Sequence, residues 1–180
     1  SWGDAMDAGL TISTDMGLTF GIYGAQRENN TPIVAAADGV RDEFNGVWYA
    51  KYSAGPVSIG YSSSYLDSGV AGTAVAAATS AKVIRTAAGV FEERQMSIAF
   101  NVSDNVSISY TDSTDTYDAQ DHNSSGTATA DVDMDTELIQ ISYSMGGMSI
   151  SAFQVDISNE AYDSDVTAHT ATEISIGLAF

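Results

Sequence analysis

Apolar and polar residues alternate with a period of two through most of this chain. The end of the sequence shows the pattern most clearly, because Ile174, Ile176, Leu178 and Phe180 occupy every second position and small or polar residues lie between them. Successive side chains of a β-strand point to opposite faces of its sheet, so this period predicts a strand with one apolar and one small, polar face. The pattern recurs and predicts about nine strands. Their expected ranges are 4–14, 17–27, 43–53, 56–66, 90–102, 106–116, 135–145, 148–158 and 171–180.

One of these segments breaks the alternation. Between Met148 and Ile157 the apolar residues change parity near Ala152 and Phe153. An extra residue in one strand of a pair produces such a change, so the sequence predicts a β-bulge at this point. No stretch of the sequence has the period of an amphipathic helix. The pattern therefore predicts an all-β protein.

The connections between the expected strands alternate in length. Short turns lie at 15–17, 54–55, 103–105 and 146–147, and long loops lie at 28–42, 67–89, 117–134 and 159–170. The short turns contain the Gly, Asp and Asn residues of tight antiparallel hairpins. Strands of about ten residues with short turns on one side and long loops on the other are typical of transmembrane β-barrels. The sequence thus predicts one domain, residues 1–180, in an antiparallel up-and-down transmembrane barrel.

Aromatic residues on the apolar face are expected at two levels. Those near the short turns are Phe20, Tyr52, Phe100, Tyr143 and Phe180, and those near the long loops are Phe44 and Tyr65. Aromatic girdles mark the two membrane interfaces of a barrel. The alternative is a soluble sheet with these rings in its core. The uniformly small and polar residues of the other face favour a water-filled lumen instead.

Composition and charge exclude several classes of function. The chain has 24 acidic and 6 basic residues and a net charge of −18. This balance argues against nucleic-acid partners bound through phosphate contacts and against a basic patch for anionic membranes. The absence of cysteine removes disulfides, thiol catalysis and cysteine-based metal sites. No apolar run approaches the ~20 residues that a transmembrane helix needs.

The C-terminal pattern carries a resemblance to a known family. Alternating Ile174, Ile176, Leu178 and Phe180 resemble the terminal signature of outer-membrane β-barrel proteins, and residues 136–153 are similar to a final hairpin of Gram-negative general diffusion porins. The resemblance implies a water-filled barrel of about sixteen strands, usually a homotrimer, in a bacterial outer membrane. It further implies that the barrel-assembly machinery reads the terminal residues, and that outer-membrane lipid and lipopolysaccharide surround the barrel. It identifies no solute.

These features together predict a porin through which ions and small hydrophilic solutes diffuse passively, without a cofactor and without enzymatic activity. Parity places larger polar residues on the lumen face. The pore-lining candidates are Tyr23, Asn45, Tyr49, Lys51, Glu93, Gln95, Asn101, Gln140 and Glu173. Rings of charged side chains set the selectivity of pores, so Lys51 and Glu93 are the candidate selectivity residues. The simpler alternative is that each only solvates the wall. No segment is recognisable as the family's constriction loop.

Carboxylates cluster beside the third long loop. Asp131, Asp133 and Asp135 resemble the start of a calcium loop, but Thr136 stands where an EF-hand needs Gly and Ser142 where it needs an acidic residue. These aspartates continue the apolar face beyond its rim, where they could share divalent cations with lipopolysaccharide through oxygen ligands. A solvated acidic loop is the alternative.

Other interpretations stay open beside the porin. A small outer-membrane barrel could act as an adhesin or structural protein through acidic external loops. An outer-membrane lipase or protease would need a catalytic histidine on a strand rim, whereas His122 and His169 are expected in loops. An odd number of strands also differs from complete single-chain bacterial barrels, which have an even number. We therefore expect an open, curved sheet that forms part of a larger barrel, and a tightly closed eight-stranded barrel would contradict this expectation.

Overall fold

The computed structural model describes residues 2–29, 42–69, 89–118 and 130–179. Within these ranges the chain forms nine β-strands and one short 3₁₀ helix, η2, at Glu160–Tyr162. The strands are β1 Trp2–Ser13, β2 Leu18–Asn29, β3 Glu43–Ala54, β4 Val57–Asp67, β5 Val90–Ser103, β6 Val106–Asp118, β7 Val132–Met145, β8 Met148–Ile157 and β9 His169–Leu178. No helix in the described part of the chain is long and apolar enough to cross a membrane.

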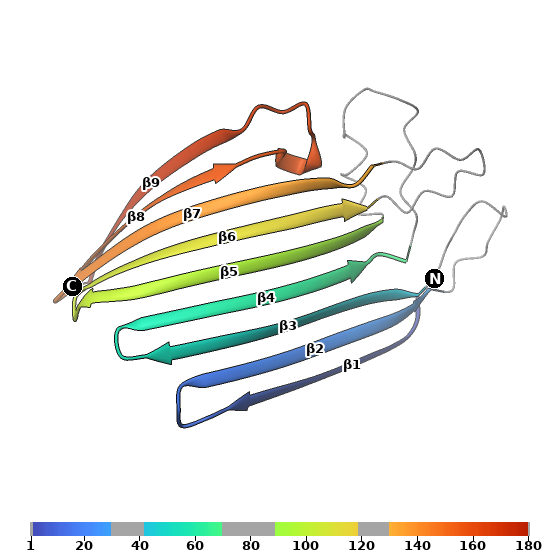
Figure 1. Ribbon diagram of the computed structural model, residues 1–180, viewed down its shortest axis with the longest axis horizontal. Helices are drawn as coiled ribbons and strands as arrows, with labels where there is room; N and C mark the ends of the chain where they lie inside the picture. The colour runs from blue at the N-terminus through green and yellow to red at the C-terminus, as the bar shows by residue number, and fades with distance from the viewer. Residues whose placement is uncertain (1, 30–41, 70–88, 119–129, 180) are drawn as a thin grey trace.

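All nine strands belong to a single antiparallel sheet with the order β1 to β9. Each strand pairs with its neighbours in sequence, as the alternation of short turns and long loops predicts. Figure 1 shows one curved layer with the tight turns at one end and the connection between β8 and β9 at the other. Within the described residues β1 and β9 form the two edges of the sheet. The expected all-β, up-and-down, open sheet is therefore confirmed.

The strand boundaries agree with the sequence prediction to within about three residues, but the predicted bulge near Ala152 is wrong. The pairing of β7 with β8 runs without a shift from Thr136–Ile157 to Met145–Met148, and β8 pairs with β9 just as regularly. A register shift occurs instead at Asn101/Ser103, beside the β5–β6 turn. The change of apolar parity in β8 therefore has a cause other than a bulge. The connection between β8 and β9 covers part of one face of the sheet.

The pairing register divides the side chains between two faces. We call the face that carries Ile98 and Ile174 the apolar face and the face that carries Ser97 and Ser175 the serine-rich face. The side chains of residues directly opposite each other in an antiparallel pair point to the same face of the sheet. The face of a residue on one strand therefore gives the face of its partner on the next strand. On β5 and β7 the apolar face is the exposed one and the serine-rich face is half-buried.

Nothing in the described structure covers the apolar face. Ile98 is 47% exposed and Ile174 is 69% exposed, and the only buried hydrophobic residues among those described are Val90 and Tyr117. A soluble domain buries most of its large aliphatic side chains and rarely leaves a wide apolar patch exposed. The sheet therefore presents an unpartnered apolar surface along its whole width.

This apolar surface crosses the hydrogen-bonded rows of the sheet obliquely. One row of directly paired residues runs through Ile12, Phe20, Ala50, Tyr61, Met96, Asp112, Glu137, Asp156 and Thr170. The row is apolar from β1 to β5 and polar from β6 to β9. In β9 the apolar residues begin at Ile174, nearer the C-terminus. The strands are thus inclined relative to the apolar band, as in transmembrane barrels, where the tilt is about 35–45°.

Candidate functional site

Hydroxyl groups line the serine-rich face in rows that cross several strands. One row of direct pairs joins Asn101, Ser107, Ser142, Ser151 and Ser175 from β5 to β9. Near the short turns this part of the sheet surrounds a hollow of about 560 Å³. Each serine hydroxyl can donate and accept hydrogen bonds. The surface is suited to contact with water or with polar solutes.

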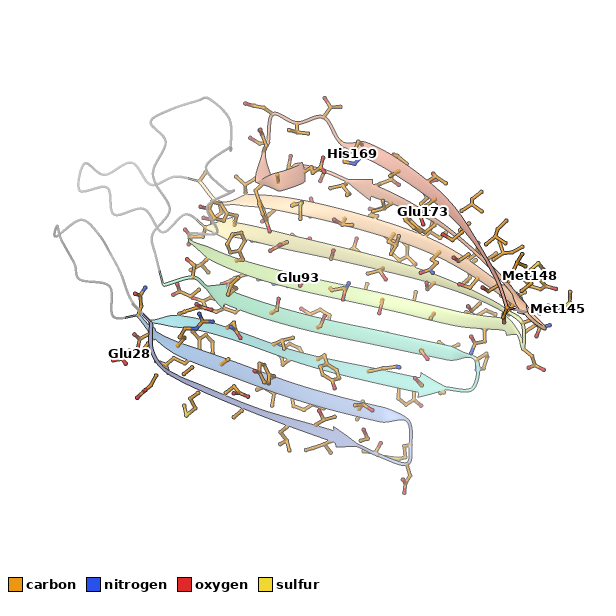
Figure 2. All side chains as sticks on the ribbon, turned by 180° about the vertical axis from the view of Figure 1, so that it is seen from behind. Glu28, Glu93, Met145, Met148, His169 and Glu173 are labelled. Carbon is orange, nitrogen blue, oxygen red and sulfur yellow. The ribbon has the colours of Figure 1, made fainter. Side chains whose placement is uncertain are left out.

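All nine pore-lining candidates lie on this serine-rich face. They are Tyr23, Asn45, Tyr49, Lys51, Glu93, Gln95, Asn101, Gln140 and Glu173. They are spread over five strands and do not converge on one point; Figure 2 labels two of them, Glu93 and Glu173. The Ser64 hydroxyl donates to Glu93 Oε2 at 3.2 Å, and the Ser175 hydroxyl donates to Glu173 Oε1 at 2.8 Å. Serines of the same face thus hold both carboxylates against the wall.

The two large tyrosines of β2 and β3 lie over glycines of the neighbouring strands. Tyr49 is directly opposite Gly21, and a Cβ atom at Gly21 would overlap the Tyr49 ring. Tyr23 is opposite Gly9, where an added Cβ would lie 2.9 Å from the ring carbon Cδ2. Each ring therefore covers a site without a side chain. This arrangement keeps bulky aromatic groups flat on the sheet, as in aromatic rescue of glycine between paired strands.

Towards the long connections the same face becomes apolar. Phe153, Val155 and Ile157 of β8 lie on the serine-rich side because they are paired with Glu173, Ala171 and His169. Apolar residues of β7 face the same way. These are Val132, Met134 and Leu138. The parity change near Ala152 is therefore a transfer of apolar residues from one face to the other within a regular strand.

The connection between β8 and β9 explains this transfer because it folds over the apolar part of the serine-rich face. We call residues 158–168 the overlying segment. The Tyr162 ring, in η2, packs on Phe91 of β5 and Tyr117 of β6 with centroid distances of 5.5 and 5.7 Å. Because β6 and β5 lie two and three strands from β8 at ~4.8 Å per strand, the segment extends roughly 10–14 Å across the sheet. It is the only described connection with such a contact.

Two hydrogen bonds fix the overlying segment in place, and they do so against a strained backbone. The Tyr162 hydroxyl donates to Asp115 Oδ2. At its start the Asn159 side-chain amide donates to the carbonyl oxygen of Asp133 at 2.7 Å. Ala161 and Tyr162 have φ values of 57° and 58°, a region that costs non-glycine residues about 1 kcal/mol or more each. The ring contacts and hydrogen bonds must offset this cost.

Two carboxylates lie side by side beneath the overlying segment. Glu93 and Asp115 are direct partners in the β5–β6 pairing, and like charges in such positions repel each other. Asp115 Oδ1 is a buried atom without a hydrogen-bond partner in the described structure. Burial and the hydrogen bond to Asp115 raise the pKa of the Tyr162 hydroxyl above its usual value. Tyr162 therefore stays protonated and keeps donating to Asp115 throughout the physiological range.

The three aspartates considered for a cation lie on the opposite, apolar face. Asp133 and Asp135 fall inside β7, which begins at Val132, three residues earlier than its expected start at 135. Their carboxylates accept hydrogen bonds from Thr116 at 2.6 Å and Thr114 at 2.8 Å. Asp131 precedes the strand. Among the described residues no three His, Asp or Glu side chains are close enough to hold one metal ion.

The candidate assembly residues occupy the last strand. Ile174, Ile176 and Leu178 share the apolar face of β9 and are 60–69% exposed, whereas Phe180 lies outside the described residues. The expectation of a loop at His169 is wrong, because His169 begins β9; its Nδ1 lies 3.3 Å from Glu160 Oε2 in the overlying segment. His122 also falls outside the described residues.

Comparisons of this chain with protein-family models, curated proteins and solved structures found no match.

The overlying segment is the part of the candidate site that the sequence analysis did not predict. Its one signal in the sequence is the run of apolar residues with reversed parity at Phe153, Val155 and Ile157. Such residues face the polar side only if something covers them. A β-bulge in β8 would produce the same reversal of parity. The continuous pairing of β8 with both β7 and β9 excludes the bulge.

Proposed function

We propose that this chain forms the wall of a porin in a bacterial outer membrane, where ions and small hydrophilic solutes diffuse through a water-filled barrel. One observation carries the proposal. A wide exposed apolar band crosses all nine strands at an angle to their hydrogen-bonded rows, while the reverse face carries rows of hydroxyl groups. Lipid on one side and water on the other account for both faces at once.

The directions of the edge strands support a larger barrel. Because the number of strands in this antiparallel sheet is odd, β1 and β9 run in the same direction. Direct pairing of β9 with β1 would create a parallel seam, whereas the bacterial single-chain barrels are antiparallel throughout. An odd number of additional strands restores an antiparallel seam and an even total. A barrel of about sixteen strands, assembled as a homotrimer among outer-membrane lipid and lipopolysaccharide, satisfies this condition.

The overlying segment supplies a narrowing of the proposed lumen. It carries Tyr162 over the inner wall beside Glu93 and Asp115, at the end where the long connections lie. An aromatic cover above two carboxylates reduces the free width and makes the local potential negative. The pore therefore admits cations more readily than anions. Nothing in this arrangement calls for a cofactor, and the proposal assigns the chain no enzymatic reaction.

The lack of native cysteine makes the two faces easy to test. Single replacements Ser97→Cys and Ile98→Cys are neighbours on opposite faces of β5. In reconstituted vesicles, a water-soluble maleimide should label Ser97→Cys quickly and Ile98→Cys only after detergent is added. Planar-bilayer recordings of the unmodified protein should show stepwise ion conductance. Equal labelling of the two positions without detergent would refute the membrane wall.

An adhesin or structural barrel is the second candidate, and the overlying segment is the observation that favours it. A segment that ring packing and hydrogen bonds hold in place would also suit a barrel whose lumen is closed and conducts no ions. If the labelling pattern holds but no conductance is recorded, the wall is in the membrane and the porin function is wrong. A binding assay for the long connections is then the next experiment.

A further inference from the structure

Two large aromatic side chains interrupt the small, polar residues of the serine-rich face on β2 and β3. Tyr23 and Tyr49 lie on this face, over Gly9 and Gly21 of the neighbouring strands. The ring contacts of the overlying segment are on β5 and β6, so within the described residues it leaves both tyrosines uncovered. Tyr23 is 43% exposed, and Tyr49 is half-buried. Each ring therefore has one side against the sheet and the other open to the serine-rich face.

The strand register places the two rings side by side. Tyr49 is paired with Gly21, and Tyr23 is two residues further along β2, so the tyrosines are diagonal neighbours. Diagonal positions of an antiparallel pair are about 7–8 Å apart. Both side chains lean towards β1, because each lies over a glycine of the preceding strand. We call this pair of rings the tyrosine platform.

Polar side chains with defined orientations continue the surface beside the tyrosine platform. Ser62 of β4 is paired with Tyr49, and its hydroxyl donates to Gln95 Oε1 at 3.5 Å. One row nearer the long connections, the Ser64 hydroxyl donates to Glu93 Oε2 at 3.2 Å. The polar groups thus begin next to the platform on β4 and end on β5, roughly 10 Å from β3. An elongated solute on the platform reaches them at the same time.

Fixed charges of both signs lie around the tyrosine platform. Lys51 is two residues from Tyr49 on the same face of β3, towards the short turns, whereas Glu93 lies towards the long connections. The face of an aromatic ring attracts cations, but Lys51 repels them. Glu93 repels anions in the same way. The surroundings of the platform therefore favour a neutral solute.

A neutral pyranose sugar matches both parts of this surface. When its hydroxyl groups are equatorial, each face of the sugar ring presents only C–H groups, whose weakly positive hydrogens are attracted to the negative face of an aromatic ring. The hydroxyl groups project from the edge of the sugar, where serine, amide and carboxylate groups can bind them. An aromatic surface with a few placed polar groups is typical of small-molecule sites.

We propose that the tyrosine platform is a stacking site for neutral oligosaccharides built from equatorially substituted pyranose units. Ser62 and Gln95 bind the hydroxyl groups of the stacked sugar. Because the rings are diagonal neighbours, the platform is longer than one sugar ring and contacts more than one unit of the same chain. The site rests on the proposed function, since it requires the serine-rich face to border the water of a lumen. It gives that lumen a preferred class of solute.

Binding is measured with cellotetraose, a neutral chain of such units, and polyethylene glycol of equal mass is the control solute. Titration calorimetry of the full chain in detergent gives the affinity. The decrease of single-channel current in planar bilayers shows whether the sugar enters the pore. We expect saturable binding and current block by cellotetraose alone. A change from about 0.1 M to about 1 M salt should leave the affinity unchanged, because screening acts on charges.

Substitutions of the tyrosines assign the binding to the platform. Tyr49→Leu should weaken cellotetraose binding roughly twofold to tenfold, the range that corresponds to one ring-face contact, and Tyr23→Leu repeats the test on the next strand. Tyr49→Phe keeps the ring and should retain the affinity. Tyr52→Leu is the matched control, because Tyr52 lies on the apolar face of the same strand. Circular dichroism of each variant checks that the sheet is retained.

The outcomes separate this inference from the proposed function. If the parent protein forms channels but cellotetraose binds no better than polyethylene glycol, the porin stands and the sugar site is refuted. If binding survives both leucine variants, the platform is not the site. If tetramethylammonium binds more tightly than cellotetraose and salt weakens its binding, the platform takes cations and the inference is refuted. Binding that needs the tyrosines, in a protein that forms no channels, would support the sugar site and refute the porin.

Discussion

Replacing Tyr162 with alanine should release the overlying segment from the sheet. The substitution removes two ring contacts, with Phe91 and Tyr117, each of which contributes about 0.5–1.5 kcal/mol. It also removes a hydrogen bond to a carboxylate, which contributes about 1.5–3 kcal/mol. Even the ring contacts alone, at about 1–3 kcal/mol, shift the equilibrium between the packed and released segment by roughly fivefold to a hundredfold.

The rate of cysteine labelling beneath the segment measures this equilibrium. Met134 is directly opposite Asp115 on the serine-rich face, so the segment shields a Met134→Cys replacement in the otherwise cysteine-free chain. When opening is fast, the labelling rate follows the fraction of molecules in which the segment is released. Tyr162→Ala should therefore speed the labelling of Met134→Cys at least fivefold, within the range given above, and single-channel conductance should rise with it.

A second substitution and a control make this prediction specific. Tyr162→Phe keeps both ring contacts and loses only the hydrogen bond to Asp115, so its labelling rate should fall between those of the parent and Tyr162→Ala. Tyr110→Ala removes a tyrosine from the apolar face and should leave the labelling rate unchanged. An unchanged rate in Tyr162→Ala, with the strands still folded, would show that the segment does not depend on this contact and would refute the reasoning.

Three further perturbations test other parts of the structure. Gly21→Val should force the Tyr49 ring off the wall and lower single-channel conductance in planar bilayers, whereas an unchanged conductance would mean that the ring does not border the pore. Ile98→Arg should reduce the free energy of unfolding from vesicles by about 2–4 kcal/mol and Ser97→Arg by much less, because only position 98 faces lipid in the proposed membrane wall; similar losses would contradict the proposal. Glu93→Gln should weaken the cation preference, measured as a reversal potential across a low-salt gradient. The cation preference of the parent protein should decline towards 1 M salt, because the Debye length there is about 3 Å. Anion preference in the parent protein would contradict the negative constriction.

The sequence predicts the strands and their two faces because a single local rule determines both. Ser97 and Ile98 are adjacent, and strand geometry alone sends them to opposite sides of β5. Each short turn also fixes which residues of the two strands that it joins are paired. Gly17, for example, has a φ of 85° in the β1–β2 turn, a value that glycine adopts without strain. These signals act over a few residues, so they can be read directly from the chain.

Contacts across the long connections could not be predicted in the same way. Tyr49 lies over Gly21 only because β2 and β3 pair in one particular register, and no tight turn joins these strands to fix that register. The position of Tyr162 depends on left-handed backbone conformations at Asn159 and Ala161 and on rings from β5 and β6. None of these has a local signature, so the sequence shows only their consequence, the reversed parity of β8.

The strictly sequential order of the sheet has a consequence for how the chain folds. Among the described strands, each forms its ladder only with the strands before and after it in the chain, so no pairing between them joins distant parts of the sequence. Folding can then proceed by adding one hairpin at a time to an existing edge, as it does in linear repeat proteins. Such growth needs no collapsed hydrophobic nucleus, which this chain, with its apolar residues turned outward, could not form in water. In the proposed membrane wall, the rate of folding should therefore depend on the arrival of strands at the bilayer surface more than on any search for contacts remote in sequence.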